Sequence, residues 1–166
     1  MKALADPEGI GLIAATSAHG PVIAELHRRC FDEAWSVFTV RQVLAMPGAF
    51  GILAVADGFD KGAGRGGLLG FALGRSAGGE CELLSLAVAD TQRGRGIGST
   101  LLSAALDRAR SDGVERMFLE VAEDNDIAQH LYREYGFQQI GRRPRYYRRP
   151  GGEAMAALTF AVPLKA

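Results

Sequence analysis

The stretch Leu83-Leu84-Ser85-Leu86-Ala87-Val88, followed by Arg93-Gly94-Arg95-Gly96-Ile97-Gly98-Ser99-Thr100, decides the fold of this chain. Its first six residues are short, apolar and branched, which predicts a buried strand. From Ser99 to Arg110 the apolar side chains recur with helical spacing and predict one buried helix face. These side chains are Leu101, Leu102, Ala105, Leu106 and Ala109. The chain therefore passes from a strand into a helix through a glycine-rich turn.

This turn has the features of a diphosphate site. Its glycines allow positive φ and let an anion approach the backbone closely. Free N–H groups and the positive end of the helix dipole attract negative charge, to which Arg93 and Arg95 add. The turn lacks the lysine of a Walker loop, and its glycine spacing differs from the Rossmann fingerprint. A glycine-rich turn without any ligand remains the alternative.

A second strand and helix follow. Arg116 to Val121 predicts another buried strand, and a strand–helix–strand unit this short implies that the two strands are parallel. Asn125 and Asp126 can cap the next helix, which Gly136 closes. We expect one face of that helix to carry Ile127, Ala128, Leu131, Tyr132 and Tyr135.

From about Glu80 to Tyr147 the chain resembles the GCN5-related N-acetyltransferase (GNAT) superfamily. The spacing Arg93-x-x-Gly96-x-Gly98 resembles the loop that binds the pyrophosphate of acetyl-CoA in that family. Residues 119–121, Asn125 and residues 131–137 resemble the second half of its core. The resemblance is strongest to the RimI-type ribosomal-protein alanine N-acetyltransferases.

The resemblance implies an α+β fold with three layers, α/β/α. Its mixed, mostly antiparallel sheet has a central parallel strand pair splayed around acetyl-CoA. The order β-α-α-β-β-β-α-β-α-β-β read along the chain agrees with that fold. We read the chain as one domain, residues 1–166, with the glycine-rich stretch 57–67 as a hairpin loop because no helix follows it. The other expected elements are strands at 11–15, 50–56, 68–75, 81–88, 138–145 and 154–162, and helices at 21–31 and 37–46.

Composition excludes several classes of protein. Lysine plus arginine and aspartate plus glutamate are both 19, so no bulk charge favours nucleic acid or membrane. The two cysteines, Cys30 and Cys81, lie far apart, which predicts neither a zinc site nor a disulfide framework. Acids and proline in residues 1–8 interrupt any apolar region of a signal peptide, so we expect no leader. No apolar run reaches the ~20 residues of a membrane span. We therefore expect a cytoplasmic monomer or weak dimer that contains no metal.

Two residues are candidates for catalysis. Alternation along the second strand turns Met117, Leu119 and Val121 to one face and Glu120 to the other. By resemblance Glu120 is the general base, although a glutamate at a strand end can also simply reach solvent. Tyr132 by resemblance protonates the leaving thiolate, and an ordinary phenol pKa of about 10 suits that role. A core tyrosine is its alternative reading, and Tyr135 is expected only to pack.

The resemblance also assigns the cofactor site. The backbone of Leu86, Ala87 and Val88 would bind the pantetheine amides as an added strand does. Asn125 would hold the pantetheine or position the acceptor while also capping its helix. The pyrophosphate would lie on the loop formed by Arg93, Gly94, Arg95, Gly96, Ile97, Gly98 and Ser99.

The acceptor site is less sharply defined. Residues 31–36 resemble a RimI-type signature in which Ala34 replaces proline, so that Trp35 is either an acceptor-site wall or an anchor between two helices. Tyr146 and Tyr147 are expected near the acceptor entrance. The arginines of residues 142–149 fit a solvated hairpin, with RNA or the cofactor phosphates left as alternatives. The acids Glu123, Asp124 and Asp126 could attract a cationic chain end.

We therefore expect direct transfer of acetyl from acetyl-CoA to the N-terminal α-amine of a protein, in a ternary complex. The expected acceptor is the alanine N-terminus of a basic small-subunit ribosomal protein. The alternatives are a small-molecule amine (a polyamine or an aminoglycoside) or a lysine acetyltransferase, and more remotely a non-catalytic acyl-CoA sensor. An acyl-enzyme on Cys81 is disfavoured because no histidine lies near it in sequence.

Overall fold

A computed structural model describes residues 9–62 and 66–165. A single seven-stranded sheet has the order β1-β2-β3-β4-β5-β7-β6. Its strands are β1 (Ile10–Ala14), β2 (Ala49–Ala56), β3 (Leu68–Ala77), β4 (Glu80–Val88), β5 (Arg116–Ala122), β6 (Gln138–Arg148) and β7 (Ala154–Pro163). All strands predicted from the sequence are present, with ends shifted by three residues or fewer. The expectation that no leader is present falls on residues 1–8, outside the described part.

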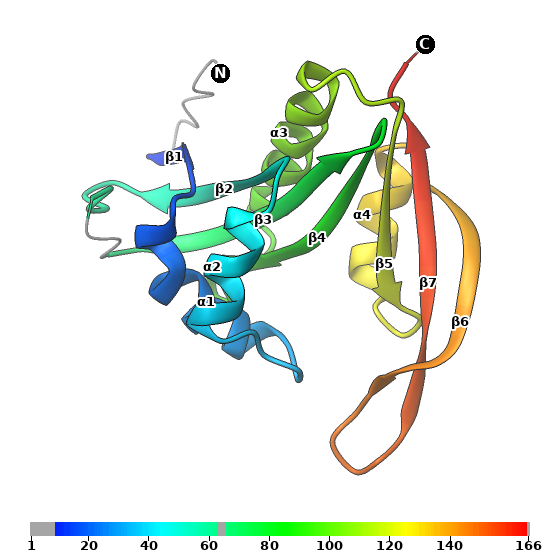
Figure 1. The fold of residues 1–166 in the computed structure, drawn as a ribbon. Coiled ribbons are helices and arrows are strands. Elements are labelled where there is room, and N and C mark those ends of the chain that lie inside the picture. The colour runs from blue at the N-terminus through cyan, green and yellow to red at the C-terminus, as the bar shows by residue number, and fades with distance from the viewer. Residues whose placement is uncertain (1–8, 63–65, 166) are drawn as a thin grey trace.

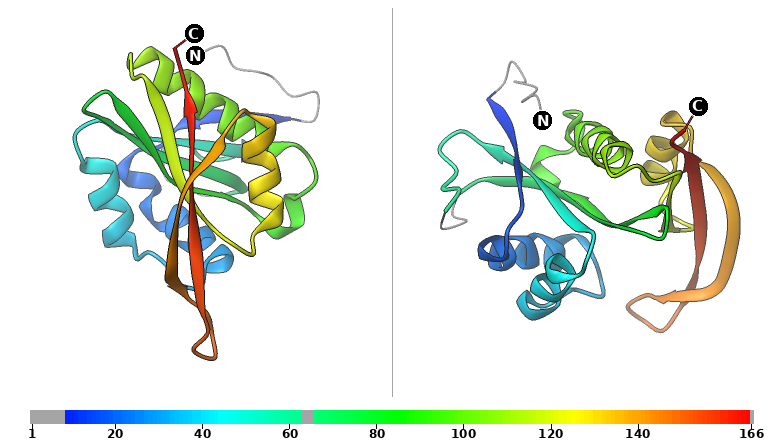
Figure 2. Two further views of the ribbon diagram at one scale, coloured as in Figure 1. Left: turned by 90° about the vertical axis from the view of Figure 1, so that its right-hand side faces the viewer. Right: turned by 45° about the horizontal axis from the view of Figure 1, so that its top comes forward.

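Helices cover both faces of the sheet, as Figures 1 and 2 show. One face carries α1 (Gly20–Cys30) and α2 (Val37–Ala45), and the other carries α3 (Ile97–Ser111) and α4 (Asp126–Glu134). Two apolar clusters form the core, one built around Ile23, Val40 and Phe71 and the other around Leu101, Met117 and Phe160. The predicted three-layer α+β architecture is thus confirmed. Short 3-10 turns precede α1 (Ser17–His19) and α3 (Asp90–Gln92).

The strands β4 and β5 form the one parallel pair of the sheet within the described residues, as the sequence predicts. Their pairing starts at Glu80 with Arg116 and ends at Leu83 with Leu119. Beyond that point β4 continues to Val88 and β5 to Ala122 without pairing to each other. Figure 1 shows the two strands diverging. The backbone edge of β4 from Leu84 onward therefore faces a gap in the sheet.

A bulge in β4 lies where this gap begins. Leu73 pairs with Ser85 but Gly74 with Leu83, so Leu84 is an extra residue on β4. A bulge changes which face the following side chains occupy and increases local twist. Leu83 packs in the α3 cluster, whereas Ala87, after the bulge, packs in the α1 cluster. The extra residue thus turns β4 away from β5 and moves the side chains that follow it to the opposite face of the sheet.

The helix α3 begins earlier than the sequence predicted. It starts at Ile97 and not at Ser99, because Gly96 takes the N-cap position in the left-handed region with φ 78°. The five apolar side chains predicted for its inner face are all buried. Gly113, with φ 74°, follows its C-terminal end, as glycine often does after a helix.

The inner face of α4 was predicted only in part. Ile127, which was predicted to face inward, is 84% exposed, whereas the polar side chain of Gln129 is buried. The amide of Gln129 donates to the carbonyl oxygens of Ala122 (3.2 Å) and Glu123 (2.9 Å). Burial of this amide is tolerable because it satisfies backbone acceptors at the turn between β5 and α4. Hydrophobic spacing alone could not reveal such an exchange.

We expect Gly74→Ala to destabilise the fold. A Cβ at Gly74 would lie 2.4 Å from Cζ of Phe50, its cross-strand neighbour, and Phe50 is itself buried. Overpacking of this kind costs about 1–3 kcal/mol. Chemical denaturation measures the loss, with Gly11→Ala as the control, since a Cβ there meets Val55 at an ordinary 3.7 Å. Equal stability of the two variants would contradict this packing.

Candidate active site

The glycine-rich loop lies at the open end of the gap between β4 and β5. A Cβ at Gly98 would lie 3.5 Å from Leu131 in α4 and 3.7 Å from Val88 at the end of β4. The first turn of α3 therefore sits between the two elements that border the gap. Gly94 and Gly96 both have φ 78°, so the positive φ expected of this turn is present. The backbone N–H groups of the first helical turn have no partner within the helix and suit an anion.

The two arginines of the loop are held by residues that come just before it. Arg93 forms an ion pair with Asp90 (2.9 Å) and its Nε donates to the carbonyl oxygen of Val88 at 3.4 Å. Arg95 donates to the side chain of Gln92. With both arginines engaged in this way, an anion at the loop would be bound chiefly by the backbone N–H groups and the helix dipole.

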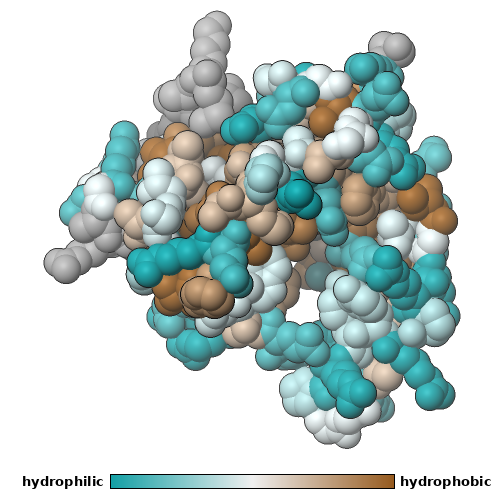
Figure 3. Space-filling model, in the orientation of Figure 1, coloured by the Kyte–Doolittle hydropathy of each residue, from teal (hydrophilic) through white to brown (hydrophobic). Residues whose placement is uncertain are grey.

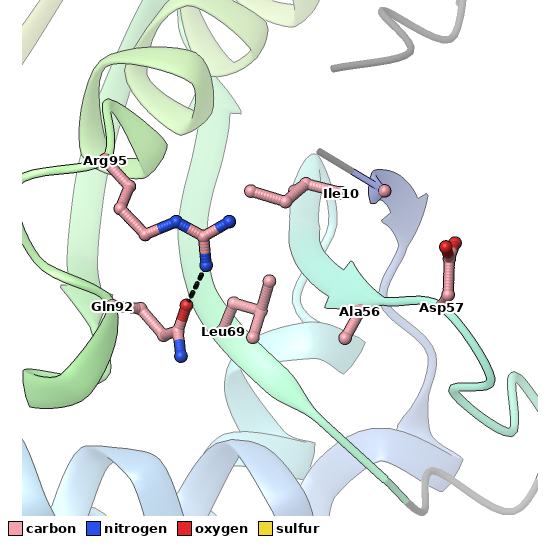
Figure 4. A pocket seen from close by; sticks show the side chains of 7 residues that line it. Ile10, Ala56, Asp57, Leu69, Gln92 and Arg95 are labelled. Carbon is pink, nitrogen blue, oxygen red and sulfur yellow. Dashed lines mark hydrogen bonds between the residues drawn. The ribbon is translucent and has the colours of Figure 1, made fainter. Parts of the chain in front are cut away.

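A pocket of about 310 Å³ lies on the β1 side of the loop and is shown in Figure 4. Arg95 and Gln92 reach into it from the loop, and Ile10 and Leu69 line it from the sheet. Neither Glu120 nor Tyr132 is among its lining residues. The pocket is thus separate from the gap where the candidate catalytic residues lie.

Glu120 lies on β5 just past the last residue that pairs with β4. Its side chain is 17% exposed, and Oε1 is 3.1 Å from Nε of Arg143 on β6. Met117, Leu119 and Val121 are buried on the opposite face, as the alternation predicted. A mostly buried carboxylate here is stabilised by its arginine, and that arginine is 63% exposed. Because Arg143 is the exposed partner, it can move toward solvent if another cation enters the gap and takes over its contact with Glu120.

Tyr132 packs on α4 from the other side of the gap. It is 7% exposed, and its ring lies 5.7 Å from that of Phe137. Burial, with a smaller contribution from Tyr147, raises its pKa to about 12. The ordinary phenol pKa that the sequence analysis assumed for Tyr132 therefore does not hold in this structure. The phenol stays protonated at all physiological pH values and always has a proton to donate.

Tyr147 on β6 connects the two candidates. Its own pKa is raised, first by burial and then by the negative charge of Glu120, and it in turn affects Tyr132. The rings of Tyr146 and Tyr147 meet edge to face with centroids 5.1 Å apart. The structure thus brings Glu120, Tyr132 and the tyrosine pair together around one gap, although they come from three separate elements.

Two further predicted residues have clear structural contacts. The side chain of Asn125 caps α4 by accepting a hydrogen bond from the N–H of Ala128 (3.2 Å). The hydroxyl of Tyr135 contacts the Ser99 hydroxyl and donates to the Ser99 carbonyl oxygen at 3.1 Å. Tyr135 therefore does more than pack, because it connects α4 to the first turn of α3.

Trp35 rests on a histidine that the sequence analysis did not single out. The backbone N–H of Trp35 donates to Nδ1 of His27 (3.0 Å), and the rings of Trp35 and His27 stack with centroids 4.8 Å apart. His27 is buried and also stacks on Phe71 of β3. Burial lowers the pKa of His27 to about 4, so the ring is neutral. His27 fixes the segment after α1, and with it Trp35.

Three arginines of the β6–β7 hairpin form ion pairs with acids, namely Arg142, Arg143 and Arg149. Arg142 binds Glu123 through two hydrogen bonds of 3.0 Å. Arg149 joins Asp32, after α1, at 3.2 Å and also contacts Asp124, after β5. These contacts favour the hairpin reading of this cluster, and they occupy two of the three acids expected to attract a cationic chain end.

The contact between Arg149 and Asp32 spans the mouth of the gap. It joins the β6–β7 hairpin to the loop between α1 and α2, and Figure 1 shows these two segments approaching each other. Figure 3 shows the surface hollowed between these parts, with mostly hydrophilic side chains around the hollow. The gap is therefore bordered at one end by the β4–β5 pairing and at the other by this ion pair.

Other chemistries find little support in the described residues. Cys81 is fully buried and burial raises its pKa, which disfavours a nucleophilic thiolate. Cys30 and Cys81 are free thiols. In the described part of the chain, no cluster of three or more potential ligands could hold a metal ion. Between residues 9 and 165, apart from 63–65, no helix is both long and apolar enough to cross a membrane.

Residues 21–137 match the acetyltransferase (GNAT) family. The chain belongs to this family. It is an N-acetyltransferase, and the resemblance seen in its sequence is confirmed. The non-catalytic reading is thereby disfavoured.

Individual relatives agree with this assignment. The acetyltransferase is 39% identical over 156 residues to N-alpha-acetyltransferase RimI of Mycobacterium tuberculosis, covering 90% of this chain and 92% of that protein. It is 34% identical over 97 residues to the [ribosomal protein bS18]-alanine N-acetyltransferase of Haemophilus ducreyi, covering 58% and 67%. The crystal structure of the ribosomal-protein-S18-alanine N-acetyltransferase from Escherichia coli has the same fold, with a TM-score of 0.84, 22% identity and 95% coverage of both chains.

We expect the acetyltransferase to lose stability on acidification because of His27. The folded protein keeps this ring neutral to about pH 4, whereas an unfolded chain protonates it near 6.5. Between these values protons bind preferentially to the unfolded state, so stability falls as pH falls. The contribution of His27 between pH 7 and pH 5 is about 2 kcal/mol.

Urea denaturation at both pH values measures this difference. His27→Asn keeps an acceptor for the Trp35 N–H and cannot be protonated, so its stability should depend less on pH. The control is His130→Asn, at an exposed histidine, which should keep the pH dependence of the wild type. An unchanged dependence in His27→Asn would contradict a buried neutral ring.

Proposed function

We propose that this acetyltransferase transfers acetyl from acetyl-CoA to the N-terminal α-amine of a protein, the alanine N-terminus of a small-subunit ribosomal protein. The observation that carries the proposal is the similarity to N-alpha-acetyltransferase RimI along nearly the whole of both chains. The similarity to a [ribosomal protein bS18]-alanine N-acetyltransferase supports the choice of acceptor. We also propose that the enzyme acts in the cytoplasm.

Acetyl-CoA would contact the borders of the gap at three places. The pyrophosphate would lie on the N–H groups of the loop from Arg93 to Ser99. The pantetheine would extend along the unpaired edge of β4 at Leu86, Ala87 and Val88, where its amides can bind as an added strand. Asn125, at the start of α4, borders the same gap. The thioester would then lie where β4 and β5 separate, beside Glu120.

Transfer would be direct, within a ternary complex. Glu120 removes a proton from the acceptor nitrogen, whose lone pair attacks the acetyl carbonyl carbon. The C–S bond breaks, and Tyr132 donates its proton to the leaving sulfur. The high pKa of Tyr132 keeps this proton on the phenol until negative charge develops on the sulfur.

The acceptor would enter from the face that carries α1 and α2, between Trp35 and the hairpin tyrosines. Trp35, Tyr146 and Tyr147 come from opposite sides of the mouth, so they can contact a chain end on two sides. The ion pairs of Arg142 and Arg149 with nearby acids keep the mouth close to neutral. A protein N-terminus suits this geometry because it is narrow and carries only one positive charge at the reacting end.

We expect a free N-terminus to be the preferred acceptor. An α-amine has a pKa near 8 and a lysine amine near 10.4, so at equal pH the neutral fraction of the α-amine is roughly a hundredfold larger. The test compares three acceptors with one enzyme: a peptide beginning Ala-Arg, the same peptide acetylated at its N-terminus but carrying an internal lysine, and spermidine. Mass spectrometry locates the acetyl group. Faster acetylation of the blocked peptide or of spermidine would replace this proposal by a lysine or small-amine acetyltransferase.

Substitution of the two candidate catalytic residues should have separable effects. Glu120→Gln should lower kcat/KM for the peptide by roughly 10²–10⁴-fold through loss of the proton acceptor. Tyr132→Phe should lower kcat and leave the affinity for acetyl-CoA unchanged, because the phenol acts on the leaving group.

Two further variants serve as controls. Glu115→Gln, just before β5, removes an exposed charge and should behave as the wild type. Tyr135→Phe breaks a contact to Ser99 and should weaken acetyl-CoA binding more than it lowers kcat. If neither Glu120→Gln nor Tyr132→Phe slows turnover tenfold, the assigned roles are wrong.

A further inference from the structure

Arg143 reaches the candidate base from two strands away. It lies on β6 opposite Ala157 of β7, and Ala157 in turn lies opposite Ala122 of β5. Directly opposite residues of an antiparallel pair share a face, and Glu120 alternates with Ala122 on that face. The side chain of Arg143 therefore extends across β7, over the small side chain of Ala157, and brings Nε within 3.1 Å of Oε1 of Glu120.

The two partners of this contact are unequally buried. The side chain of Glu120 is 17% exposed and that of Arg143 is 63% exposed. The side chains of Arg142 and Arg149, the other hairpin arginines that form ion pairs, are 50% and 32% exposed. Arg143 is thus the most exposed of the three, and among residues 9–62 and 66–165 it forms an ion pair with Glu120 alone. A weak contact of this kind, with its cation in solvent, can be exchanged for another.

Tyr146 offers the guanidinium of Arg143 a second place to rest. Cζ of Arg143 lies 5.5 Å from the centre of the Tyr146 ring, within the range of cation–π attraction. The guanidinium can therefore leave the carboxylate of Glu120 for solvent and still remain beside an aromatic face. Its departure leaves a mostly buried carboxylate unpaired, which is unfavourable unless another cation takes its place.

The acceptor amine is such a cation. An α-amine with a pKa near 8 is mostly an ammonium at neutral pH. When it displaces Arg143, one ion pair of Glu120 is exchanged for another, and the number of positive charges beside the carboxylate stays the same. A neutral molecule such as water cannot replace the lost contact. The arginine therefore discriminates by charge before any bond to the acceptor forms.

We propose that Arg143 is a displaceable internal cation of the acceptor site, which engages Glu120 until an ammonium group replaces it. This inference rests on the proposed function for the reaction and for the role of Glu120. Hydrolysis of acetyl-CoA would form a C–O bond from water, break the C–S bond, and pass a water proton to Glu120 and the Tyr132 proton to sulfur. With Arg143 in place Glu120 cannot take that proton, so the thioester is protected while no acceptor is bound.

Two measurable quantities should change together if this is so. Only those molecules in which Glu120 is free of Arg143 are ready for an acceptor, and the apparent affinity is reduced by that fraction. Hydrolysis without an acceptor depends on the same fraction. Removal of the guanidinium should therefore lower the Kd of the acceptor and raise the rate of hydrolysis by one common factor. The strength of exposed ion pairs makes this factor about two- to sixfold.

The test compares Arg143→Gln with Arg148→Gln. Both variants remove one exposed positive charge from the hairpin, but Arg148 directly follows Tyr147, which faces Glu120, and so lies on the opposite face of β6. Calorimetry measures the affinity for the Ala-Arg peptide with CoA bound in place of acetyl-CoA. Thiol release from acetyl-CoA without an acceptor measures hydrolysis, and kcat and Tm are recorded for each variant. Arg143→Lys, which keeps a cation, is the conservative variant.

We expect Arg143→Gln to bind the peptide more tightly and to hydrolyse acetyl-CoA faster, both by the same factor of about two- to sixfold. Its kcat for the peptide should stay close to that of the wild type, because Arg143 has already left Glu120 in the ternary complex. Added salt should weaken its peptide affinity more steeply than that of the wild type, since an ion pair then forms without another one breaking. Arg148→Gln and Arg143→Lys should behave as the wild type.

Three results would overturn the inference. Weaker peptide binding by Arg143→Gln would make the arginine part of the surface that binds the acceptor. A lower kcat with unchanged affinity, or a lower Tm that accounts for lost activity, would make it a support for Glu120 or for the hairpin. Affinity and hydrolysis equal to those of Arg148→Gln would mean that Glu120 is never blocked. If the wild type acetylates spermidine and not the peptide, the proposed acceptor fails, and the same comparison with spermidine, also a cationic amine, then decides the role of Arg143 by itself.

Discussion

The early end of the β4–β5 pairing is the constraint on which the rest of this structure depends. A parallel sheet normally satisfies every backbone group of its inner strands, and here the pairing stops after Leu83 and Leu119. The extra residue Leu84 turns β4 aside, and its unpaired edge then needs another source of hydrogen bonds. A cofactor with amide groups can supply them. Binding of such a ligand thus completes a sheet that the polypeptide alone leaves open.

Each group of the candidate site is placed by its distance from this opening. Glu120 follows the last residue of β5 that pairs with β4. The helix after β4 presents its N-terminus at one border, and the helix after β5 presents Tyr132 at the other. Two consecutive strand–helix units therefore bring the start of α3, the carboxylate of Glu120 and the buried phenol of Tyr132 to the borders of one opening. No residue of the site has to be held by a long loop.

The sequence predicted what depends on periodicity and on local signals. The buried face of α3, the parallel pair and the alternation around Glu120 follow from the spacing of apolar residues, and glycines marked the helix ends correctly. Contacts between distant segments left no such signal. Gln129 is buried because backbone acceptors happen to lie beside it, and His27 is neutral because Trp35 and Phe71 cover it. The partners of the hairpin arginines, and the rise in the pKa of Tyr132, likewise depend on tertiary packing.

The ion pair between Arg149 and Asp32 has a topological consequence. With the paired ends of β4 and β5 on one side and this contact on the other, the polypeptide forms a closed ring around the opening. A ring of this kind can be threaded by the free end of a chain, whereas a loop of a folded protein would have to enter doubled back on itself. Because exposed ion pairs weaken as salt screens them, the ring is held by a contact that responds to ionic strength. For the acceptor proposed above, such a ring would favour a free chain end over an internal loop independently of the chemistry at the reacting centre.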